Sequence, residues 1–283
     1  MANLFRNKQI ILIFFLLIFF CFPYSSQAQS KNSKKEKGKL ADFEDKIKEK
    51  KEEPEDDSNH HSHSGIFFFI ESPGDIFFLP RLLIGTFPGE DSLFYEGRFW
   101  HRHFSDYPYW IKNEGIYSRR TGKKISIHFA GHYFYNSSVL QGFHINGRIY
   151  PLPFLGLEFR YTDLTEKLHT RNDHLRLYDA YINYDRIRSR RWVLWWGLGV
   201  KGLQGDDTYH GLSFNFGTEI YPKNPISLNM LLNVGSLNSQ TVSEFQIKVN
   251  WHIQRDIIYL GYQYFSTGGL VLDGIIFGLG IFL

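Results

Sequence analysis

From Lys124 to Leu283, short segments of the chain alternate apolar and polar side chains and are separated by compact turns. Successive side chains of a β-strand point to opposite faces, so an alternating stretch can set one face against lipid and the other against a polar lumen. About ten such segments are present,. Residues 123–283 are therefore predicted to be all-β, a transmembrane antiparallel up-and-down β-barrel of about ten strands, with eight or twelve as alternatives.

Parity assigns each side chain of these segments to one of two faces. In the first segment Ile127 and Phe129 have the outward parity and Ser126 the inward one. In the fifth, Gly197 and Gly199 face inward, which predicts crowding in the lumen. Side chains largely fill a barrel of eight to ten strands, so we expect a packed ion network across it. Its expected members are Arg148, Glu158, Arg160, Asp179, Lys201, Glu219 and Lys248.

With an even number of strands, the start of the first strand and the end of the last strand lie on the same side of the membrane. For this architecture that side is the periplasm. The links between strands should then alternate between the two compartments. Those expected outside are 136–138, 165–173, 205–207, 235–240 and 266–268; those expected inside are 151–153, 186–191, 221–225 and 254–256. Most of the outer links are short.

The first 28 residues have the composition of a secretory signal peptide. Cations precede an apolar run, Ile10–Phe22, that is too short for a membrane-spanning helix,. The small residues Ser26 and Ala28 predict a mature chain that begins at Gln29. Cleavage would remove Cys21, the only cysteine, and leave no thiol or disulfide chemistry,.

Residues 29–64 are expected to form a charged, disordered linker in the periplasm. Lys31–Asp57 is almost entirely charged and buries too little apolar surface to offset the entropy of ordering,. Opposite charges at helical spacing predict only a transient helix between Lys39 and Lys51,. Three histidines close the linker and are candidate ligands of an adventitious metal site, because neutral imidazoles bind zinc, copper or nickel: His60, His61 and His63.

Residues 65–122 are rich in aromatic and apolar side chains. Pro73, Pro80 and Pro88 divide the segment into pieces that are too short for a membrane helix and alternate poorly,. Three placements remain open: a cap at the barrel mouth, a plug inside the lumen, or an extra hairpin that would make twelve strands. We favour the cap.

The alternating strands, aromatic-rich ends and terminal segment resemble those of the small bacterial outer-membrane β-barrel proteins in general. The outward residues of the terminal segment recur at every second position: Ile275, Phe277, Leu279, Ile281 and Leu283. The resemblance implies an outer-membrane location and recognition of this segment by the barrel-assembly machinery. The family usually ends on Phe, whereas here Phe282 is penultimate. The resemblance defines an architecture and no particular activity.

An enzymatic site can be assembled from inward residues, since an imidazole oriented by a carboxylate can activate a hydroxyl or water. The candidates are His128, His132, His144, Glu158 and Asp179, with Ser126 as a hydroxyl. A narrow polar lumen, however, needs the same residue types to satisfy its own buried charges, and this interpretation is favoured. The short outer links leave little surface for a peptide substrate.

The sequence therefore favours a structural or interaction module of the cell envelope over an enzyme. A lipid-modifying outer-membrane enzyme or a narrow channel is the alternative. No cofactor is expected. The expected partners are outer-membrane lipid, the barrel-assembly machinery, and a periplasmic or membrane protein reached through the linker. The net charge of +3 is too small to indicate binding of nucleic acid,.

Overall fold

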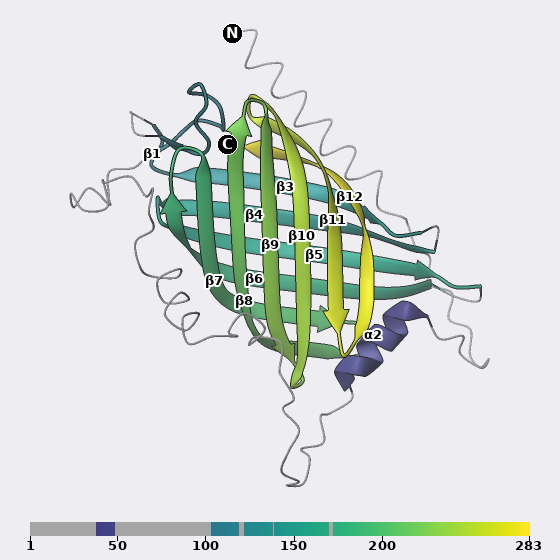
Figure 1. Cartoon of the computed structure of the whole chain (residues 1–283). Helices are drawn as coiled ribbons and strands as arrows, with labels where there is room; N and C mark the ends of the chain where they lie inside the picture. The colour runs from purple at the N-terminus through teal and green to yellow at the C-terminus, as the bar shows by residue number, and fades with distance from the viewer. Residues whose placement is uncertain (1–37, 49–102, 119–121, 138, 170–171) are drawn as a thin grey trace, which may run out of the picture. The chain divides into compact units, whose positions relative to one another are not determined.

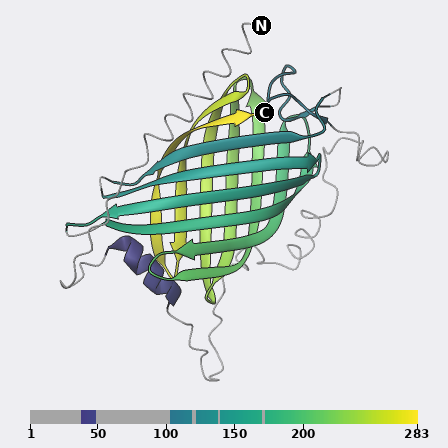
Figure 2. The same ribbon diagram turned by 180° about the vertical axis from the view of Figure 1, so that it is seen from behind.

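Ten strands form a closed barrel in which each strand pairs antiparallel with its neighbours along the chain (Figures 1 and 2). The computed structural model describes residues 38–48, 103–118, 122–137, 139–169 and 172–283, which belong to one compact unit, Glu36–Leu283. The barrel strands are β3 (Ser126–Tyr135), β4 (Leu140–Leu152), β5 (Leu155–Lys167), β6 (Asn172–Arg188), β7 (Trp192–Gln204), β8 (Thr208–Lys223), β9 (Ile226–Leu237), β10 (Gln240–Ile253), β11 (Asp256–Thr267) and β12 (Leu270–Phe282).

The first and last barrel strands close the sheet. β12 pairs with β3 from Ile275 opposite Tyr135 to Phe282 opposite His128. Closure satisfies the backbone groups that an open edge would leave unpaired. The predicted antiparallel barrel of ten strands is confirmed, and no further strand joins it within the described residues.

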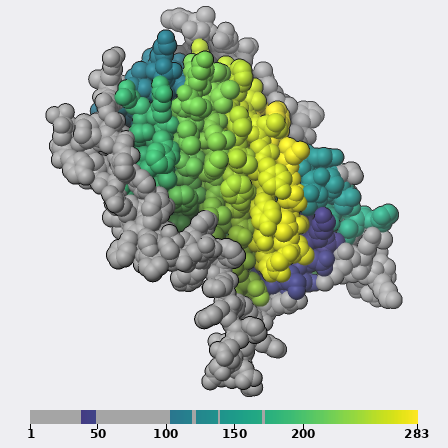
Figure 3. Space-filling view, viewed as in Figure 1, coloured from purple at the N-terminus to yellow at the C-terminus, as the bar shows by residue number. Residues whose placement is uncertain are grey.

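The two faces of the wall follow the predicted parity. Phe129, Leu198 and Val200 point outward and are between 42% and 61% exposed, whereas Lys201 points inward and is 1% exposed. Strands β9 to β12 form a continuous wall of side chains in Figure 3. Leu194 has the outward parity but is buried, which differs from the expectation; it follows the register shift between β6 and β7.

Gly197 and Gly199 lie where the lumen leaves no room for a side chain. A Cβ at Gly197 would overlap the side-chain oxygen of Asn183, and one at Gly199 would overlap the carbonyl oxygen of Ala180. The predicted crowding is confirmed. Gly197 allows the side chains of Asn183 and Asn215 to approach the β7 backbone, and Gly199 allows the Tyr181 ring and the Ala180 carbonyl to do so,.

The barrel has a terminal end and a helix end. The terminal end holds the C-terminus, the start of β3 and the links 153–154, 189–191, 224–225 and 254–255. The helix end holds the helix α2 (Lys39–Lys48) and the links 136–139, 168–171, 205–207, 238–239 and 268–269. All nine links are two to four residues long, as their positions between the strands show.

Two links at the helix end are tight two-residue hairpins. Asn238 and Ser239 have φ of 50° and 65°, and Gly268 and Gly269 have φ of 53° and 83°. Two positive φ values are what a type I′ turn requires, because its twist matches that of the flanking strands. These hairpins hold the rim close to the end of the strands.

Outside the barrel, the described residues form α2 and a two-stranded sheet, β1 (His103–Phe104) with β2 (Tyr117–Ser118). Within the described ranges, no helix is long and apolar enough to cross a bilayer. The helix differs from the solvated linker expected for residues 29–64, because three of its apolar side chains are buried at the helix end of the barrel.

Candidate functional site

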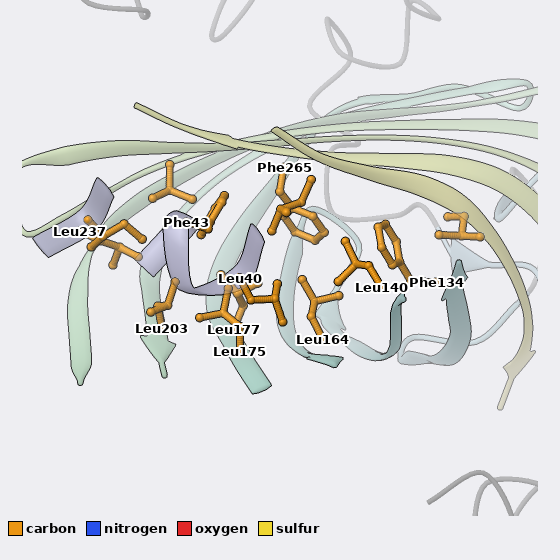
Figure 4. Packing of buried hydrophobic residues seen from close by; sticks show 14 residues of the cluster. Leu40, Phe43, Phe134, Leu140, Leu164, Leu175, Leu177, Leu203, Leu237 and Phe265 are labelled. Atoms are coloured by element: carbon orange, nitrogen blue, oxygen red, sulfur yellow. The ribbon is translucent and has the colours of Figure 1, made fainter. Parts of the chain in front are cut away.

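Helix α2 fills the helix end of the lumen with one apolar face. Leu40, Phe43 and Ile47 are spaced at i, i+3 and i+7, which places them on the same side of a helix, and each is at most 2% exposed,. Figure 4 shows the helix between opposite walls of the barrel. The surrounding side chains, here called the apolar ring, are Phe134, Leu140, Leu164, Leu175, Leu177, Leu203, Leu237, Val242, Phe265, Leu272 and Ile276.

The first turn of α2 is held by a carboxylate of the barrel. The Leu40 N–H donates to Glu166 Oε2 at 2.8 Å, and Glu166 is buried. A negative charge is favourable at a helix N-terminus, where backbone N–H groups lack helical partners. Glu166 therefore caps the helix from the β5 strand.

The middle and last turn of α2 are held by two links of the rim. The Glu44 carboxylate accepts the backbone N–H groups of Asp206 and Asp207 at 2.9 and 2.8 Å. Asn238 Nδ2 donates to the carbonyl oxygen of Ile47 at 2.8 Å. Lys48 Nζ lies 3.1 Å from Asp207, and this hydrogen bond raises the pKa of Lys48. A ten-residue helix is marginal in water, so its order here depends on this docking,.

Below α2, buried cations and carboxylates form a network across the lumen. Arg160 reaches Asp179 at 3.5 Å and Glu244 at 3.4 Å. Lys201 lies 2.8 Å from Asp179 and 3.9 Å from Glu244. On the other side Arg148 pairs with Glu158 at 2.6 Å, and Arg160 is 3.8 Å from the same carboxylate. Five of these six residues, all except Glu244, were expected members, so the larger part of the expected network is confirmed.

Amide side chains complete the coordination of the buried carboxylates. Glu244 accepts from Asn233 at 2.7 Å and from Gln263 at 2.8 Å. Glu158 accepts from Asn146 at 2.8 Å and Asn183 at 2.6 Å. Burial of an ion is costly unless charge pairing and hydrogen bonds compensate for lost water. Glu244 was not among the expected members of the network, although its inward parity on β10 was visible in the sequence.

The two remaining expected members of the network, Glu219 and Lys248, have other contacts. Glu219 accepts from Ser227 Oγ at 2.7 Å and from Asn250 Nδ2 at 3.1 Å. Lys248 Nζ lies 5.1 Å from the centre of the Tyr259 ring. Both face the lumen, and each is held by neighbours on nearby strands.

The terminal end is closed by a cluster of aromatic side chains. Phe104 packs at ring-centroid distances of 5.2 Å from Tyr117 and 5.3 Å from Tyr150 of the barrel. The Tyr117 hydroxyl contacts Asp185 and lies 2.8 Å from the carbonyl oxygen of Pro153. The remaining members of this aromatic cap are Tyr109, Ile116, Ala130, Val193, Trp195, Tyr221, Leu231, Ile257, Tyr259 and Phe282.

Hydrogen bonds join residues 103–118 to Lys123, just before β3, and to the terminal end of the barrel. The Phe104 N–H donates to Lys123 at 2.8 Å, and the Gly115 N–H donates to Arg190 at 2.6 Å. The Tyr109 hydroxyl donates to the carbonyl oxygen of Ile226. Burial raises the pKa of Tyr109 to about 12. Residues 103–118 are the larger part of 65–122 that the structure describes, and they pack against the terminal end of the barrel.

The three candidate histidines lie in the lumen but not beside the candidate carboxylates. His132 and His144 stack with ring centroids 4.4 Å apart, and His128 stacks on Phe282 at 4.6 Å. His132 Nε2 is 2.9 Å from Gln263, and His144 Nδ1 is 2.7 Å from Thr162.

Glu158 and Asp179 are instead paired with cations, as described above. No hydrogen bond joins His128, His132 or His144 to either carboxylate in the described structure. In the described structure these three imidazoles contact Tyr259, Gln263, Thr162, one another and Phe282 instead.

In the described residues, no group of three or more His, Cys, Asp or Glu side chains is arranged to hold a metal ion. His60, His61 and His63 lie outside the described ranges, so their metal binding stays a prediction.

The chain matches no protein-family model and no curated protein. Among solved structures it is similar to Neisserial surface protein A, with 12% identity and a TM-score of 0.28 over 56% of this chain and 95% of that one. It is also similar to Ail, the attachment invasion locus protein of Yersinia pestis, with 11% identity and a TM-score of 0.26 over 56% and 96% of the two chains. Both are small outer-membrane β-barrels. The assignment of the fold rests on the strand pairing of this chain itself.

Proposed function

We propose that this protein is a sealed outer-membrane β-barrel that acts as a structural or interaction module of the cell envelope. The observation that carries the proposal is the filling of the lumen at three levels. The apolar ring and α2 occupy the helix end, the ion network crosses the middle, and the aromatic cap closes the terminal end. Ten strands enclose an interior that side chains can fill, whereas open aqueous channels belong to wider barrels.

The membrane location is supported by the outward face of the barrel and by the predicted signal peptide. Apolar side chains exposed on the wall include Phe129, Leu198 and Phe277. A contiguous belt of this kind is costly in water and favourable in lipid. The proposed partners are accordingly outer-membrane lipid and, during biogenesis, the barrel-assembly machinery.

Planar-bilayer recording tests the sealed state. The purified protein should give no steady conductance, while its migration in detergent should change on heating, as expected of a folded barrel. A matched variant, with the signal peptide joined directly to residue 49, lacks α2 but keeps the central network. It should also be non-conducting. Stable nanosiemens-scale pores in the full chain would contradict the proposal in favour of a channel.

The alternative of a lipid-modifying enzyme has its own test. Replacing His128, His132 and His144 together should lower folding stability and leave the mass spectrum of lipid A unchanged, because the proposed role of these rings is packing. Overexpression of the full chain should leave that spectrum unchanged as well. A change in lipid A mass that depends on the three histidines would replace the proposal with an enzyme.

A protein partner reached through residues 29–64 is part of the same proposal. Except for Gly38 and α2, that segment lies outside the described residues. Crosslinking in intact envelopes should capture the partner with the full chain and lose it when residues 31–57 are deleted. Equal capture by both proteins would exclude the segment as the binding element.

A further inference from the structure

The segment that precedes the barrel contacts both of its ends. Helix α2 touches the links 205–207 and 238–239 of the helix end through Glu44 and Asn238. Residues 103–118, which carry part of the aromatic cap, contact the terminal end through Pro153 and Arg190. Helix α2 and residues 103–118 therefore contact opposite ends of the barrel.

The side of the membrane that each end faces follows from strand number. The ten strands bring the start of β3 and the end of β12 to the same end, where Phe282 lies opposite His128. In single-chain bacterial barrels the even strand number goes with short periplasmic turns and longer outer links. The longest links here, 136–139 and 168–171, are at the helix end. The helix end accordingly corresponds to the exterior.

We infer that α2 lies at the outer face of the membrane and forms part of the surface that the protein presents to the exterior. The inference rests on the proposed outer-membrane location. It gives the apolar ring and its rim a defined function, which is to bind an amphipathic helix that seals the outer mouth. Glu166, the Asp206 and Asp207 amides and Asn238 fix the position of that helix.

This placement changes the expectation for the linker. Residues 29–64 were expected in the periplasm, and the links 205–207 and 235–240 were expected outside. The two expectations are incompatible for residues 39–48, because α2 is hydrogen-bonded to those links. The polar side chains of α2 thus belong to the outer surface, where Lys39 is exposed.

Four matched lysine substitutions test the placement. Cys21 lies in the predicted signal peptide, so each variant would carry a single thiol in the mature protein. Lys39→Cys and Lys167→Cys are at the helix end, and Lys112→Cys and Lys223→Cys are at the terminal end; all four lysines are exposed. Intact cells of a Gram-negative host would be treated with a membrane-impermeant maleimide, and labelling compared with that after denaturation.

We expect Lys39→Cys and Lys167→Cys to be labelled in intact cells, and Lys112→Cys and Lys223→Cys only after the outer membrane is permeabilised. If Lys167→Cys is labelled and Lys39→Cys is not, α2 does not lie at the outer face and the inference is overturned. The reverse pattern, with only Lys112→Cys and Lys223→Cys labelled, would overturn the orientation while leaving an outer-membrane barrel. Absence of all four variants from the outer-membrane fraction would instead refute the proposed function itself.

Discussion

The two ends of this barrel are closed by different physical means. At the helix end, aliphatic side chains of α2 enter the apolar ring, and hydrogen bonds to Glu166, Asp206 and Asp207 fix the helix. At the terminal end, aromatic rings pack edge to face or tilted, and backbone bonds join the cap to the wall. No strand pairing holds α2, whereas residue 123 pairs directly with Phe104 just before β3. The helix is therefore the more separable of the two closures.

The largest effect is expected from disrupting the ion network, which lies between the two ends of the barrel. Arg160→Met should lower the free energy of unfolding by about 3–5 kcal/mol, because it leaves Asp179 and Glu244 short of a buried cation,. Denaturant titration of the refolded barrel in detergent micelles would measure the loss. A Lys167→Met control at the exposed rim should change it little. Equal losses of unfolding free energy in the two variants would mean that the ion network makes no specific contribution to stability.

A pair of phenylalanine substitutions compares the two closures directly. Phe43→Ala and Phe104→Ala each remove a fully buried ring and should each cost about 3–5 kcal/mol locally,. Hydrogen exchange should increase only within α2 in the first variant, because α2 opens without the strands. In the second it should increase in β1, β2 and the adjoining start of β3. Faster exchange throughout the barrel in Phe43→Ala would show that α2 is not separable.

A smaller effect is expected from removing a single negative charge at the helix end. Glu44→Gln keeps the shape of the side chain and removes the negative charge that accepts two backbone N–H groups. Hydrogen bonds to charged groups contribute about 1.5–3 kcal/mol, so docking should weaken by no more than that amount. The rate of protease cleavage of the N-terminal segment would measure this weakening of helix docking. Lys39→Gln, at an exposed position of the same helix, is the control. Cleavage at the same rate in both variants would assign no special role to Glu44.

The smallest effect concerns the cap at high pH. Burial raises the pKa of Tyr109 to about 12, above the unfolded value near 10,. The folded cap therefore holds the phenolic proton more tightly than the unfolded chain. Its contribution to stability is complete below pH 10 and is lost as the pH rises through 12. Tyr109→Phe should lower stability by about 0.5–1.5 kcal/mol at neutral pH through the lost bond to Ile226,.

The pH dependence of that variant provides the discriminating measurement. Between pH 10 and 12 the loss of cap stability should be smaller in Tyr109→Phe than in the full protein, as followed by hydrogen exchange of residues 103–118. Identical profiles would assign the transition to another group. The helix end should remain docked over this range, since its apolar contacts and its hydrogen bonds from backbone N–H groups to Glu166 and Glu44 do not depend on a phenolic proton.

Much of the barrel was predictable because alternation is a local property. Each of the ten segments carries its own period of two, so the strands and most faces could be assigned without knowing their neighbours. The inward charges were predictable for the same reason. Arg148, Glu158 and Arg160 have inward parity, and a narrow lumen requires such groups to pair.

The position of α2 could not be predicted from the linker sequence. Leu40, Phe43 and Ile47 are three apolar residues in a charged segment, too few to form a core among themselves,. Their partners come from nine of the ten strands and meet only when the barrel closes. The sequence by itself determined the strands and most of their faces, and it favoured ten as the number that closes the sheet. The tertiary structure alone decided which carboxylate meets which cation, and that a charged segment closes the mouth, because both depend on side chains that are distant in the chain and adjacent only in the closed barrel.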